Sequence, residues 1–121
     1  MNLSNDEKKY ILDEYLRHIS HFLDGDYQKR VWILREGPEC QAFDDAVCDF
    51  FDIGEPILED YKNFGITEMQ HALLLKLHDE FRKFSETHDM PENFLSTQEW
   101  NKIKGLARDV LIAFNYRKIH S

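Results

Sequence analysis

Carboxylates are the reactive side chains that this sequence concentrates most. Between positions 36 and 60 the chain has no lysine or arginine but nine acids: Glu36, Glu39, Asp44, Asp45, Asp49, Asp52, Glu55, Glu59 and Asp60. The other residues contain 23 − 9 = 14 acids and 15 bases, a net charge of +1, so this segment, with −9, accounts for the formal charge of −8. Carboxylates grouped in this way attract protons, metal ions or a basic protein surface.

Three of these acids have the spacing of a helical stripe. Asp45, Asp49 and Asp52 are separated by four and three residues, and like charges at this spacing destabilise a helix by about 0.2–0.5 kcal/mol per pair. One interpretation is a solvated helix face, although such a face usually mixes charges of both signs. The other, which we favour, is a docking surface for a cationic partner, because clustered charge accelerates association.

The docking hypothesis defines a set of contact residues and a set of apolar anchors. The expected contacts are Asp44, Asp45, Asp49, Asp52, Glu55, Glu59, Asp60 and Tyr61. The anchors that tight binding requires are expected among Phe51, Ile53, Ile57 and Tyr61. Lys29 and Arg30 precede the segment, and pairing between them and the acids would weaken the hypothesis.

Metal binding has weaker support. The chain has six histidines but only one E-x-x-H match, Glu68 with His71. A di-iron bundle requires two such motifs and two further glutamates, and Glu68 is equally explained by the helix dipole. His18 and His21, one turn apart, would hold a surface metal weakly. The sequence predicts no metal or cofactor, and a small helical metalloprotein is a less favoured alternative.

Catalytic motifs are missing from the sequence. Cys40 and Cys48 have no histidine close by in sequence that could activate either thiol as a nucleophile. There is no G-x-S-x-G, no glycine-rich phosphate loop and no C-x-x-C. We therefore expect no catalytic residues and no enzymatic activity.

The elements that position these residues follow a helical period almost throughout. Capping pairs are expected at Ser4 with Glu7, Thr67 with Gln70 and Ser96 with Glu99. Apolar stripes follow them, for example Met69, Leu73, Leu77, Phe81 and Phe84. The sequence predicts one all-α domain over residues 1–121, a compact bundle of five to six helices with short connections.

Two regions are less regular. The acidic helix is expected from about Pro38 to Phe51, with Gly54 and Pro56 separating it from a short helix that ends at Gly65. Residues 27–35 contain a short apolar run that fits either a helix or a strand. Helix is preferred because a lone strand would have no partner elsewhere in the chain.

Composition narrows the class of partner. The pI near 5.1 disfavours direct binding to nucleic acid or an anionic membrane. The longest apolar run, 72–75, is too short to span a membrane, and no signal peptide is evident. A cytoplasmic protein is expected. The oligomeric state stays open, because Leu106 and Ile112 widen the apolar stripe of the last helix.

A family resemblance lies in the stretches "QKRVW", "FDDAVCDFFD", "EPILEDY", "FGIT" and "LIAFNYRK". They are patterns of core and surface residues spread over about half of the chain, and the sequence resembles the small all-α immunity proteins of bacterial contact-dependent growth-inhibition systems.

The resemblance implies a cytoplasmic protein, without enzymatic activity or cofactor, that binds and neutralises a cognate C-terminal toxin domain, often an RNase. It carries over no functional residue, so the acidic contacts rest on the charge pattern alone. The alternative is another acidic protein-binding module that mimics nucleic acid.

Overall fold

The computed structural model describes residues 3–35, 43–88 and 90–116, and these ranges contain helices and turns but no strand. The all-α prediction is confirmed. In chain order the elements are α1 (Asn5–Ser20), η1 (His21–Leu23), α2 (Gly25–Tyr27), η2 (Gln28–Ile33), α3 (Phe43–Glu59), η3 (Tyr61–Phe64), α4 (Glu68–Thr87), α5 (Pro91–Phe94) and α6 (Gln98–Ala113).

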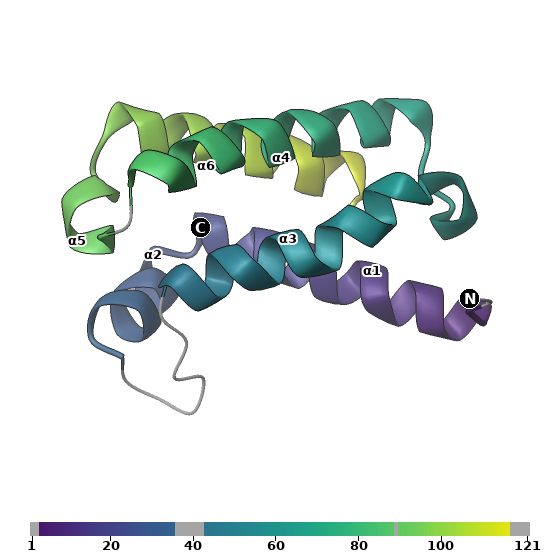
Figure 1. Cartoon of the computed structure of the whole chain (residues 1–121), viewed down its shortest axis with the longest axis horizontal. Helices are drawn as coiled ribbons and strands as arrows, with labels where there is room; N and C mark the ends of the chain where they lie inside the picture. The colour runs from purple at the N-terminus through teal and green to yellow at the C-terminus, as the bar shows by residue number, and fades with distance from the viewer. Residues whose placement is uncertain (1–2, 36–42, 89, 117–121) are drawn as a thin grey trace.

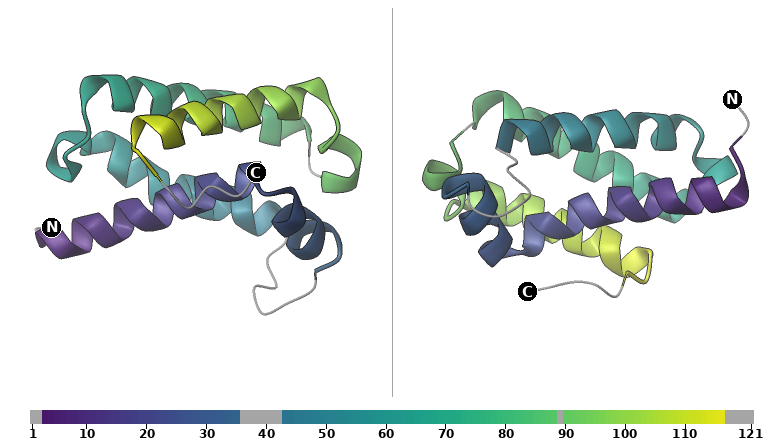
Figure 2. Two further views of the ribbon diagram at one scale, coloured as in Figure 1. Left: turned by 180° about the vertical axis from the view of Figure 1, so that it is seen from behind. Right: turned by 90° about the horizontal axis from the view of Figure 1, so that it is seen from below.

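The four long helices form an up-and-down bundle. Helix α1 packs on α3, α3 on α4, α4 on α6, and α6 returns to α1. Figure 1 shows two layers, α1 with α3 and α4 with α6, in which successive long helices run in opposite directions. The short α2 and α5 lie at one end of the bundle, and Figure 2 shows the same order from behind and from below. Short connections between antiparallel neighbours are typical of this topology.

Aromatic rings from five elements meet at the centre of the core. Phe22 lies between 4.8 and 6.5 Å, centroid to centroid, from each of Trp32, Phe50, Phe81 and Trp100. None of the five is more than 3% exposed. Burying each ring stabilises the fold by about 1.5–3 kcal/mol, and the tilted or edge-on geometries are those that ring quadrupoles favour. The core therefore joins both layers.

The break expected at Gly54 and Pro56 is wrong, because α3 continues through both residues to Glu59. A Cβ on Gly54 would lie 2.8 Å from the ring of Tyr15, so glycine is needed for α1 and α3 to approach closely. Pro56 removes one helical hydrogen bond, yet it lies on the exposed face, where water can satisfy the freed carbonyl. The expected start at Pro38 lies outside the described residues.

Helix caps agree with the sequence at two of three positions. Ser4 and Thr67 each accept a hydrogen bond from the backbone of their capping partner, and both boxes are reciprocal. The third prediction is off by one residue: Thr97, not Ser96, accepts from Trp100 N and caps α6. The Thr97 hydroxyl also donates to Phe94 O at 2.7 Å, so it joins α5 to α6.

Residues 28–33 are helical, as preferred, but they form a π-helix rather than an α-helix. Leu34 N donates to Lys29 O at 2.9 Å, the five-residue spacing of this wider turn. The turn buries Val31 and Trp32. The buried Gln28 side chain donates to the carbonyls of His21 and Phe22, both at 2.9 Å, which satisfies two backbone acceptors after α1.

Candidate partner-binding site

The described acids of the charged segment form one exposed surface, here called the acidic face: Asp44, Asp45, Asp49, Asp52, Glu55 and Glu59 on α3, followed by Asp60. All are exposed except Asp49, which is half-buried. Helix α3 contains no lysine or arginine. The opposite side of the helix packs into the core through residues such as Phe43, Ala46 and Phe50. Glu36 and Glu39 lie outside the described residues.

An arginine borders the acidic face on the α4 side, and a histidine lies near it on the α1 side. Arg82 of α4 forms an ion pair with Glu55, with 3.1 Å between Nη2 and Oε1. On the α1 side, burial lowers the pKa of His18, while the nearby charge of Asp49 acts in the opposite direction. Among the bases that were expected to pair with the acids, Arg30 places its guanidinium 5.9 Å from the ring centroid of Tyr27.

Phe51 lies at the edge of the acidic face nearest to α4. Its ring is half-buried, 5.8 Å from Phe81 and edge-on to His78 at 4.8 Å. The Arg82 guanidinium lies 4.7 Å from the Phe51 centroid, within the range of a cation–π contact. An aromatic ring and the Glu55 carboxylate therefore hold the same cation.

Tyr61 lies beyond the C-terminal end of α3 and connects it to α4. Its ring stacks on His71 at 3.7 Å, and its hydroxyl donates to Glu68 Oε1 at 2.8 Å, which raises the pKa of Tyr61. His71 Nε2 is 3.2 Å from Leu58 O. Glu68 and His71, the two E-x-x-H residues, therefore contact Tyr61 and the backbone carbonyl of Leu58. Among the described residues, no group of three or more His, Cys, Asp or Glu is placed to hold a metal.

The apolar residues expected as anchors divide into two groups. Ile57 is fully buried, so this part of the prediction is wrong: its side chain belongs to the core. Phe51, Ile53 and Tyr61 are half-buried and pack against the core from the surface. They keep some area available to a partner. Cys48 is an exposed free thiol on the acidic face, and Cys40 lies outside the described residues.

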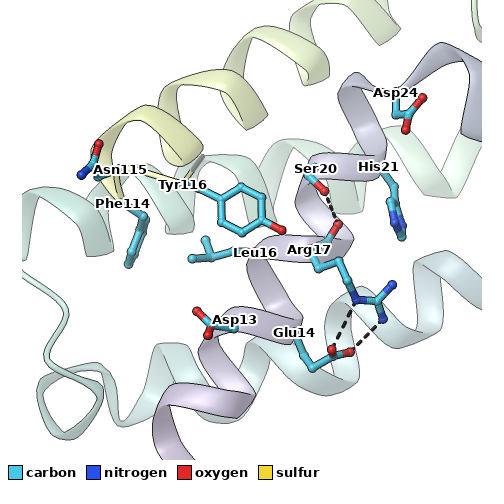
Figure 3. Close-up of a pocket in the computed structure, with 10 residues that line it drawn as sticks. All are labelled: Asp13, Glu14, Leu16, Arg17, Ser20, His21, Asp24, Phe114, Asn115 and Tyr116. Atoms are coloured by element: carbon cyan, nitrogen blue, oxygen red, sulfur yellow. Dashed lines mark hydrogen bonds and ion pairs between the residues drawn. The ribbon is translucent and has the colours of Figure 1, made fainter. Parts of the chain in front are cut away.

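A groove between α1 and the end of α6 was not anticipated. It has a volume of about 520 Å³, and Figure 3 shows its lining: Asp13, Glu14, Leu16, Arg17, Ser20, His21, Asp24, Phe114, Asn115 and Tyr116. Arg17 pairs with Glu14 at 2.8 Å, and Ser20 Oγ donates to Arg17 O at 2.6 Å. No sequence motif signals this groove, because its two walls are about 90 residues apart in the chain.

Comparison with known proteins identifies no relative. No family model matches the chain, and no curated protein or solved structure is significantly similar to it. Within the described residues, no helix is both long and apolar enough to cross a membrane.

Proposed function

We propose that this chain is an immunity protein that binds a cognate toxin domain, a cationic nuclease, through the acidic face. The observation that carries the proposal is the composition of α3: six carboxylates, five of them exposed, and no lysine or arginine on the same helix. Core packing does not require this arrangement, because the acids point away from the core.

Charge complementarity supports this choice of partner. A nuclease binds phosphates in a basic groove, and a row of carboxylates can occupy such a groove in place of phosphates. Clustered charge also raises the association rate, to about 10⁸–10⁹ M⁻¹s⁻¹ at low salt. Rapid capture suits an inhibitor whose target is harmful at low concentration. The half-buried Phe51, Ile53 and Tyr61 supply apolar contact beside the charges.

The test is protection of sensitive cells. Cells that express this chain are challenged with the toxin domain encoded next to its gene, and the complex is purified at low and high salt. Survival with binding that weakens as salt rises is the expected result. Survival with salt-insensitive binding would support the immunity function but would indicate that the toxin domain contacts apolar surfaces and not the acidic face. Death despite good expression would overturn the proposal for that toxin and favour an acidic mimic aimed at a nucleic-acid-binding regulator.

A further inference from the structure

One cation already occupies the border of the acidic face. The Arg82 guanidinium reaches from α4 to α3, where it lies 4.7 Å from the Phe51 centroid and 3.1 Å from Glu55 Oε1. Asp52 and Glu59 lie three residues before and four residues after Glu55, and both are exposed. On a helix these spacings place all three carboxylates on the same side.

We propose that Phe51 and Glu55 form a seat for guanidinium groups, so that the acidic face selects arginine over lysine in its partner. In the free protein Arg82 occupies this seat, and a partner arginine replaces it on binding. The inference rests on the proposed role of the acidic face and specifies the residue type that the partner presents there.

The chemistry of the seat favours a guanidinium. This group is planar and weakly hydrated, so it can lie against the ring of Phe51 while its N–H groups point to the Glu55 carboxylate. A lysine ammonium is compact and strongly hydrated, and it loses more hydration when it approaches a ring. A surface with carboxylates alone would attract both cations by charge without this distinction.

Displacement of Arg82 from the seat by a partner arginine should cost little free energy. Its side chain is 48% exposed and that of Glu55 is 54% exposed, so water screens their attraction. Asp52 and Glu59 extend the negative surface beside the seat. An incoming arginine therefore meets more carboxylates than Arg82 does, and Arg82 can return to solvent.

The floor of the seat provides a second observation. His78 is only 7% exposed, and its ring lies edge-on to Phe51 at 4.8 Å. Its Nε2 is buried with no hydrogen-bond partner in the described part of the chain. The charged groups around it are Glu55, Asp79 and Arg82. A buried ring nitrogen without a partner fits a neutral imidazole, which adds no positive charge beneath an incoming guanidinium.

The first experiment uses two peptides of equal charge, ten arginines and ten lysines, with dissociation constants measured by calorimetry. We expect the wild type to bind the arginine peptide about three- to fivefold more tightly. Phe51→Leu should abolish this preference, and Phe51→Tyr, which keeps a ring, should retain it. Thermal melts confirm that both variants are folded. Equal affinities in the wild type, or a preference that survives Phe51→Leu, would overturn the proposal.

The second experiment separates the seat from charge alone. Arg82→Met and Lys83→Met each remove one positive charge from adjacent positions of α4, but only Arg82 contacts Phe51. Arg82→Met should strengthen arginine-peptide binding more than Lys83→Met does, and equal effects would contradict the proposal. The probes are peptides, so the arginine preference can be measured even if the protection test fails. Conversely, absence of an arginine preference would overturn the guanidinium seat but would not exclude binding of the toxin domain.

Discussion

The two layers of the bundle share one core but differ in charge. Helices α1 and α3 together contain ten acids and three bases, a net charge of −7, whereas α4 and α6 contain six of each. The balanced layer places opposite charges within reach, as in the pair between Glu80 and Lys102 at 3.2 Å. Both layers are helical. The fold therefore does not require the excess charge of α3, which supports the proposal of a cationic partner.

The largest expected effect comes from the same substitution made in each layer. Gly54→Ala should destabilise the protein by about 1–3 kcal/mol, because the new methyl group would lie 2.8 Å from Tyr15. Gly105→Ala should stabilise it by about 0.5–1 kcal/mol, since nothing lies within 4 Å of a Cβ there. Urea denaturation of both variants measures the difference. Similar effects at the two sites would mean that α1 and α3 do not approach closely at Gly54.

Charge reversal in each layer tests whether the contrast matters for binding. Asp52→Lys combined with Glu59→Lys should slow association with the proposed toxin partner about tenfold or more at low salt, and less as salt rises. The matched control is Glu86→Lys with Asp109→Lys, which changes the net charge equally on α4 and α6. Stopped-flow kinetics give the rates. Equal slowing by both pairs would show that net charge matters, not the acidic face.

The cap of α6 gives a smaller effect within the balanced layer. Thr97→Ala should cost about 1 kcal/mol, because it removes the acceptor for Trp100 N and the donor to Phe94 O. Ser96→Ala, one residue earlier, should change the free energy of unfolding little, since Ser96 is exposed and lies outside the cap. Chemical denaturation measures both. A larger loss of stability for Ser96→Ala than for Thr97→Ala would indicate that Ser96 caps α6, as expected from the sequence.

A pH comparison uses one histidine in each layer. Burial lowers the pKa of His18 in α1 and of His78 in α4 below the ordinary value. At about pH 7.5 and above, both states of the protein keep these rings largely neutral. As the pH falls below that value, the unfolded chain takes up protons more readily, so stability decreases.

Substitution of either histidine by glutamine should therefore flatten the loss of stability between pH 7.5 and 5.5, measured by urea denaturation. The variants serve as controls for one another, since each keeps the other histidine. A profile as steep as that of the wild type in both variants would contradict the linkage to burial.

Several features of the fold could be predicted because they depend on neighbours in the sequence. The caps at Ser4 and Thr67 and the helical period of the long elements belong to this class. The failures involve distant contacts. Met69 fits the apolar stripe of α4 but is 66% exposed, whereas Leu74 is fully buried. In the sequence, Gly54 indicates a helix break. In the structure it allows close packing against Tyr15, which is 39 residues away in the chain.

The acidic face was predictable in a similar, partial way. The spacing of the acids along one helix predicts that they share an exposed face. In the structure the acids from Asp44 to Asp60 are exposed, except Asp49, which is half-buried. The sequence did not separate Ile57, which is in the core, from Phe51, which is half-buried at the edge of the face. That distinction depends on how α4 packs against α3.

The sequence by itself determined that this protein is helical and that its negative charge belongs to one segment, because helix periodicity and charge are local properties of the chain. Only the tertiary structure decided which cations border that charge. Arg82 is 27 residues from Glu55 and 31 from Phe51 in sequence, yet it contacts both. Their meeting depends on the antiparallel packing of α3 and α4, which no local pattern specifies.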